Sequence, residues 1–96
     1  MNDEALRALP KVELHCHLEL TARNDLLKEL LAMKGVRLSE AKFRRQYLIT
    51  EPVGDLPTLL NIFLGHRDLL DSAEVVERMT YECCEDMSRN GVRILE

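Results

Sequence analysis

Apolar and polar residues alternate strictly in one early part of the chain. Between Lys11 and Leu18 every second residue is apolar, and the positions between them carry Glu13, His15 and His17. A period of two is typical of a β-strand, in which neighbouring side chains point to opposite faces of a sheet. We therefore predict a strand over residues 11–18, with both histidines on its polar face.

Helical spacing replaces this alternation in the next part of the chain. Apolar residues recur three or four positions apart until Gly35, which predicts a helix with Thr21 or Asn24 as its N-cap. The apolar stripe of this helix consists of Leu26, Leu27, Leu30, Leu31 and Met33. A shorter helix is predicted from Ser39 to about Tyr47.

Two further helices are predicted in the second half. Asp55 is a plausible N-cap for the first of them, with Pro57 in its first turn. The apolar stripe of this helix consists of Leu56, Leu59, Leu60, Phe63 and Leu64. Asp71 and Glu74 form a capping-box pattern at the start of the second helix, which ends before Gly91.

Strand character returns from Val92 to Leu95. Two strands separated by helices are expected to pair in parallel through a right-handed crossover. A sheet of two strands is not stable alone, so the pattern is typical of the opening of an α/β domain. We expect the chain to end while the second strand is still running.

Composition narrows the class of protein. The chain has 96 residues, of which 46% are hydrophobic and 31% charged, as in one small globular domain. A net charge of -4 and the absence of tryptophan argue against nucleic acid as a partner. No secretory signal pattern or membrane-length apolar run is present, and the three cysteines are odd in number, so a reducing cytoplasm is expected.

The two histidines are the candidate metal ligands. Imidazoles at positions i and i+2 of a strand face the same way and can converge on one zinc ion. A pair of this kind is a weak signal alone, but His15 and His17 lie near the carboxyl end of the predicted strand, where α/β barrels place their chemistry. Glu19 is a third ligand-type residue in the same alternation, whereas Cys16 is expected to point to the opposite face as a small buried hydrophobe.

Other polar residues are assigned no chemistry. His66 has charged neighbours and is expected to be solvated on its helix. Acidic and basic residues also cluster on the last predicted helix, as on an exposed helical face: Arg78, Glu82, Glu85, Asp86 and Arg89.

The run LPKVELHCHLE closely resembles the N-terminal signature of the adenosine deaminase family, metal-dependent hydrolases with a TIM (β/α)8 barrel fold. The segment LPTLLNIF resembles the helix that gates the purine pocket in that family, and RMTYECCEDMSRNGVRILE resembles its long helix and second strand. The resemblance implies an α/β fold in which residues 1–96 are the N-terminal fragment of a single TIM-barrel deaminase domain.

The resemblance also implies roles for individual residues. It makes His15 and His17 two ligands of one zinc ion, and it places Glu19 where many members have an aspartate that meets the sugar hydroxyl. Because that aspartate is followed by glycine in the family and Glu19 by Leu20, the expected substrate is adenosine, adenine or another 6-aminopurine. The gate of the substrate pocket would consist of Leu56, Leu59, Leu60 and Phe63.

The family's remaining zinc ligands and its proton-donating glutamate have no counterpart in residues 1–96. No catalytic residue is therefore expected within this chain, and the chain alone should bind zinc weakly and be inactive. Two other hypotheses stay open. One is a different amidohydrolase-type metal-dependent hydrolase, and the other is a non-catalytic remnant that serves as a helical interaction module.

Overall fold

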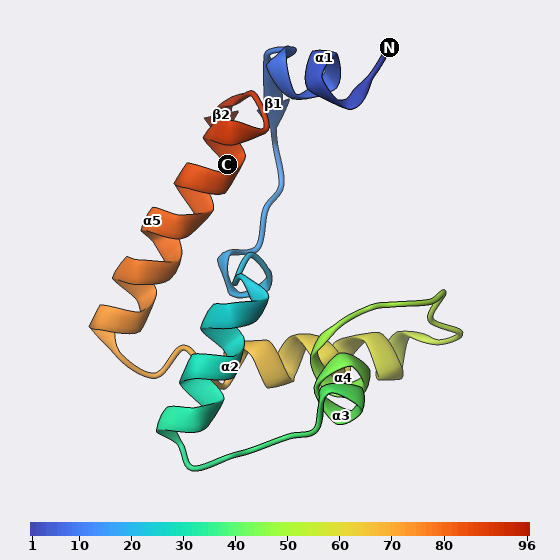
Figure 1. Cartoon of the computed structure of the whole chain (residues 1–96), viewed down its shortest axis with the longest axis vertical. Coiled ribbons are helices and arrows are strands. Elements are labelled where there is room, and N and C mark those ends of the chain that lie inside the picture. Colours follow the sequence, from blue (N-terminus) through green and yellow to red (C-terminus); the bar gives the residue numbers. More distant parts are fainter.

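Two parallel strands join the beginning and the end of the chain in the computed structural model, which describes all residues from 1 to 96. Figure 1 shows strand β1 (Lys11–Glu13) beside strand β2 (Val92–Leu95). Val12 is paired with Ile94 in a parallel register that is irregular between Lys11 and Val12. The predicted parallel pairing of the two strands is confirmed.

Strand β1 is shorter than predicted. It ends at Glu13, and residues 14–17 continue as an extended segment into a 3-10 helix, η1 (Leu18–Leu20). Beyond Glu13 a single backbone hydrogen bond still joins the two segments, from the Cys16 amide to the Glu96 carbonyl, at 2.9 Å. Side chains of the predicted apolar face are exposed, by 54% at Val12 and 70% at Leu14.

Five α-helices accompany the sheet (Figure 1). The first was not predicted; it is capped by Asn2, whose side chain accepts a hydrogen bond from the Ala5 amide. The other four match the predicted elements within a few residues. The helices are α1 (Asp3–Ala8), α2 (Asn24–Met33), α3 (Glu40–Tyr47), α4 (Leu56–Arg67) and α5 (Ala73–Arg89).

Two of the predicted helix caps are present. The Ser39 side chain accepts a hydrogen bond from the Lys42 amide at the start of α3, at 3.2 Å. The Asp55 side chain accepts one from the Thr58 amide at the start of α4, at 2.8 Å. These bonds satisfy amide groups that have no partner within the helix.

The other two cap predictions were wrong. Arg23 occupies the N-cap position of α2 without a side-chain bond to the helix, so neither Thr21 nor Asn24 caps it. Ser72 caps α5, whereas Asp71 forms an ion pair with Lys34.

The core lies where α2, α3 and α5 meet. Four leucines of α2 are buried there, whereas Met33, predicted on the same stripe, is 73% exposed. Helix α4 keeps much of its apolar surface outside this core, with Leu56, Leu60 and Leu64 exposed. The core consists of Leu26, Leu27, Leu30, Leu31, Phe43, Leu69 and Met79.

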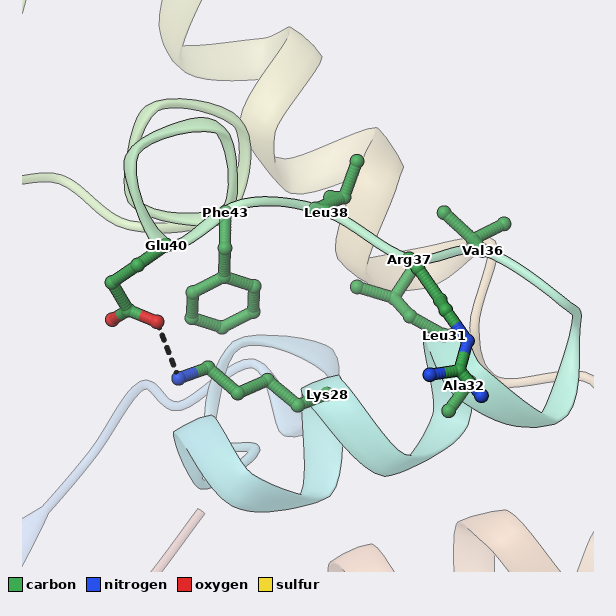
Figure 2. Close-up of a pocket in the computed structure, with 8 residues that line it drawn as sticks. All are labelled: Lys28, Leu31, Ala32, Val36, Arg37, Leu38, Glu40 and Phe43. Atoms are coloured by element: carbon green, nitrogen blue, oxygen red, sulfur yellow. Dashed lines mark hydrogen bonds and ion pairs between the residues drawn. The ribbon is translucent and has the colours of Figure 1, made fainter.

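A shallow cavity of about 330 Å³ opens between α2 and α3, next to this core (Figure 2). Its wall includes Phe43, whose ring centroid lies 4.9 Å from the Lys28 ammonium, and that ammonium donates a hydrogen bond to Glu40 at 2.8 Å. The cation lies close enough to the ring for a favourable cation–π contact. No histidine or cysteine lines this cavity, so we assign it no chemistry.

The turn between α5 and β2 is closed by a glycine and a lysine. Gly91 has a φ of +83°, and a Cβ atom there would lie 2.3 Å from the Arg7 carbonyl oxygen and 2.5 Å from that of Leu9. The Lys11 ammonium donates hydrogen bonds to the carbonyls of Leu9, at 2.9 Å, and Asn90, at 2.5 Å. These contacts hold the segment after α1 against the start of β2.

Candidate metal centre

The two histidines lie side by side just beyond the carboxyl end of β1. Both side chains are exposed, and their rings stack with centroids 5.1 Å apart. The Nε2 atom of His15 is 3.2 Å from the Nε2 atom of His17. The two potential ligand atoms thus converge on the same point, as their spacing in the sequence predicted.

This separation can be compared with what one metal ion requires. Two nitrogens bound to zinc at about 2.0 to 2.1 Å with a tetrahedral angle lie about 3.3 to 3.4 Å apart. The observed 3.2 Å is close to that value. The donor atoms of His15 and His17 therefore fit two positions of a zinc coordination sphere.

Glu19 lies behind the histidine pair. Its Oε1 atom is 3.3 Å from Nδ1 of His17, the ring nitrogen that faces away from His15. A carboxylate that accepts a hydrogen bond from Nδ1–H leaves Nε2 with a free lone pair and orients the ring. Glu19 was predicted to meet a substrate hydroxyl, and this contact with His17 is a role that the spacing alone did not predict.

Cys16 is half-buried and lines a pocket of about 400 Å³ together with both histidines. Helix α5 supplies another wall through Cys83 and Asp86. No group of three or more histidine, cysteine or acidic side chains is arranged to hold a metal ion.

The residues predicted to gate a substrate pocket do not line this one. Leu56 is 63% exposed and Leu60 is 44% exposed, while Leu59 and Phe63 are half-buried. Phe63 lines a separate, largely apolar pocket of about 410 Å³. Leu20 lines both pockets, so it is the residue shared by the pocket that Phe63 of α4 lines and the pocket of the two histidines.

His66 is buried, so the prediction of a solvated side chain was wrong. It is 7% exposed, and its Nε2 donates a hydrogen bond to the Tyr47 carbonyl at 2.6 Å. Because a carbonyl only accepts, Nε2 carries the proton and Nδ1, which is buried without a partner, is the acceptor. Tyr47 precedes His66 by 19 residues. The residues next to His66 in the sequence therefore do not indicate that it is buried.

The acidic residues of α5 are not a freely solvated face either. Arg23, at the start of α2, donates hydrogen bonds to Glu85 at 2.6 Å and to Asp86 at 2.7 Å, and it lies 3.8 Å from Glu82. Hydrogen bonds from Arg23 hold the pKa of the Asp86 carboxyl below its usual range. The cluster therefore fastens α2 to α5, beside the pocket that contains the histidines.

We expect Arg23→Met to lower the midpoint of thermal unfolding by a few degrees at pH 7. A carboxyl whose pKa is depressed on folding contributes stability above its ordinary pKa, near 4, and loses that contribution as the pH falls through the folded value. The difference between the variant and the parent should therefore shrink below about pH 4. Calorimetry across this range measures it.

Arg89→Met is the matched control. Arg89 is 69% exposed and forms a single ion pair, with Glu85 at 3.4 Å. Exposed single pairs contribute little, so this variant should unfold near the parent at every pH. An equal loss in both variants would contradict the role given to Arg23.

The arrangement defines a helix-rich α/β protein with a two-histidine candidate metal site at the end of its first strand. Residues 10–96 match the family model described as adenosine deaminase. The chain therefore belongs to the adenosine deaminase family.

Curated relatives agree with this assignment. An adenosine deaminase of Clostridium perfringens (strain ATCC 13124) is 35% identical over 91 residues, which is 92% of this chain and 27% of the relative. One from Vibrio atlanticus is 30% identical over 93% of this chain and 27% of its own length, and one from Enterococcus faecalis is 28% identical over 100% and 29%. The chain thus spans between a quarter and a third of the relatives it matches.

No solved structure matches the chain. Among its helices, none has both the length and the hydropathy needed to cross a membrane.

Proposed function

We propose that this chain is the N-terminal part of a TIM-barrel enzyme that hydrolytically deaminates adenosine or a related 6-aminopurine with the help of zinc. Membership of the adenosine deaminase family supports the reaction class. The observation that carries the zinc proposal is the 3.2 Å separation between the Nε2 atoms of His15 and His17.

His15 and His17 would hold the zinc ion, which when bound supplies Lewis-acid activation of water near neutral pH. Glu19 would act through His17, because its carboxylate lies 3.3 Å from Nδ1 and keeps the ring in the tautomer that leaves Nε2 free. The remaining ligands and the proton donor would come from the other part of the barrel.

The residues around this pair support the proposed substrate class. A carboxylate held by His17 is a weaker partner for a sugar hydroxyl, and Leu20 adds apolar surface between the histidine pocket and Phe63. Apolar walls with a few polar groups suit a flat purine ring. We propose Glu19, Leu56, Leu59, Leu60 and Phe63 as the substrate-binding residues of this chain.

A chimera tests the proposal. The matching 91-residue segment of the Clostridium perfringens relative would be replaced by this chain, and ammonia release from adenosine and from adenine would be measured. We expect turnover of at least one of these substrates by the chimera and none by the 96-residue chain alone. A folded, zinc-loaded chimera that is inactive on both substrates would rule the proposal out.

Two variants of the chimera separate metal binding from substrate choice. His17→Ala should abolish turnover of every substrate, since it removes a proposed ligand. The double change Glu19→Asp with Leu20→Gly should raise kcat/KM for adenosine relative to adenine, because it restores the family's usual pair. Cys84→Ala, at an exposed position of α5, should leave both substrates unaffected.

A further inference from the structure

The cavity between α2 and α3 has no histidine or cysteine in its lining, but its size and its apolar wall suit a bound molecule. Its volume of about 330 Å³ lies at the lower end of the range, about 300–1,000 Å³, that is typical of small-molecule pockets. Phe43 and Leu31 belong both to its wall and to the protein core, so a molecule in the cavity would touch the core. Five apolar residues line it: Leu31, Ala32, Val36, Leu38 and Phe43.

The turn that ends α2 forms one edge of the cavity. The Gly35 amide donates a hydrogen bond to the Ala32 carbonyl at 3.0 Å. The Val36 amide donates one to the Leu31 carbonyl at 2.9 Å. These two bonds are those of a Schellman motif, in which a glycine with positive φ, here +75°, turns the chain back onto the last turn of the helix. Val36 and Arg37 are thereby placed beside α2 in the wall of the cavity (Figure 2).

Three charged side chains also line the cavity, and only two of them are paired. Lys28 and Glu40 form an ion pair of 2.8 Å at one end, where the Lys28 ammonium lies over the Phe43 ring. Arg37 lies at the other end (Figure 2), and its guanidinium takes part in none of the chain's ion pairs. The cavity therefore offers an unpaired cation next to an apolar wall.

We propose that this cavity binds a small organic carboxylate with an apolar body. The carboxylate accepts hydrogen bonds from the Arg37 guanidinium, whose planar set of donors matches the two oxygens of a carboxylate. The apolar body lies against Leu31 and Phe43, and the pair of Lys28 with Glu40 closes the far end.

The charges of the lining select this class of ligand. Two cations and one anion leave the lining with a single positive charge, which a monoanion neutralises and a phosphate dianion would exceed. A neutral apolar molecule would cover the Arg37 guanidinium without giving its donors a partner, which costs free energy. The proposal is independent of the deaminase activity, because no residue of this cavity lines the pocket of the histidines.

The test titrates the 96-residue chain at pH 7 with 4-phenylbutyrate and, separately, with its neutral amide, 4-phenylbutyramide. Backbone amide shifts in ¹H–¹⁵N NMR spectra report both the affinity and the place of binding. We expect the acid to shift amides of residues 28–43 in a saturable way. The amide should bind roughly fivefold more weakly, the upper end of what an exposed ion pair contributes.

Arg37→Met should remove this preference for the acid, whereas Arg45→Met should keep it. Arg45 is the matched control, because it is also exposed and in no ion pair but lines a different pocket. Val36→Ser should weaken the acid and the amide alike, since it removes only apolar surface.

Glu40→Gln should bind the acid about two- to fivefold more tightly than the parent, because it removes a negative charge and frees the Lys28 ammonium. Loss of folding cannot produce this gain, and circular dichroism verifies that each variant is folded. The proposal fails if the parent binds the acid and the amide equally, if the acid shifts only amides outside residues 28–43, or if folded Arg37→Met keeps the preference. The comparison of the two probes on the parent decides the matter even if a variant does not fold.

Discussion

Alanine in place of Gly91 is expected to lower the free energy of unfolding by about 3 kcal/mol, from strain and overpacking together. The residue has a φ of +83°, which L-residues with a Cβ atom adopt at a cost of about 1–2 kcal/mol. The added Cβ would also lie 2.3 Å from the Arg7 carbonyl oxygen, where only a shift of the backbone could relieve the contact. Urea denaturation followed by circular dichroism measures the loss.

Two other glycines separate these causes. Gly35 has a φ of +75° but nothing within 4 Å of a built Cβ, so Gly35→Ala should cost about 1 kcal/mol from strain alone. Gly54 has open space and no positive φ, so Gly54→Ala should be close to neutral. Equal losses for Gly91→Ala and Gly35→Ala would show that the segment after α1 moves away easily.

The second large effect concerns zinc. We expect His15→Ala and His17→Ala each to remove nearly all specific zinc binding by the chain, because one imidazole alone cannot chelate the ion. Glu19→Gln should weaken binding by about tenfold, the lower end of what outer-shell carboxylates contribute. Competition against a chromophoric chelator measures all three affinities.

The cysteines supply the controls for this experiment. Cys84→Ala should bind zinc like the parent, since its side chain is exposed on α5. The double variant Cys16→Ala with Cys83→Ala should keep the histidine-dependent binding. If this double variant loses zinc while His15→Ala and His17→Ala keep it, the thiols and not the imidazoles bind the metal.

Features set by neighbouring residues could be predicted from the sequence. Ser39 and Asp55 cap their helices because each side chain reaches an amide only three residues away. The closeness of His15 and His17 likewise follows from two residues of separation in an extended segment. The pairing of β1 with β2 followed from the order of the elements rather than from contacts.

Features set by distant contacts could not be predicted. The extent of β1 depends on how far β2 runs alongside it, and the burial of His66 depends on the Tyr47 carbonyl. Cys83 is 67 residues from Cys16, so the helical pattern of α5 indicated a core residue but not its place beside the histidines. Asp71 illustrates the same limit, because it pairs with the distant Lys34, while Ser72 caps α5.

The pairing of Val12 with Ile94 also has a consequence for synthesis of the chain, since 82 residues (94 − 12) separate the two partners. Ribosomes add about 5–20 residues per second, so β1 waits roughly 4–16 s for its partner to be made. During that interval β1 leads into the histidine segment of the nascent chain without a partner strand. The histidine pocket can form only after α5 and β2 have left the ribosome, which makes it one of the last parts of this chain to mature.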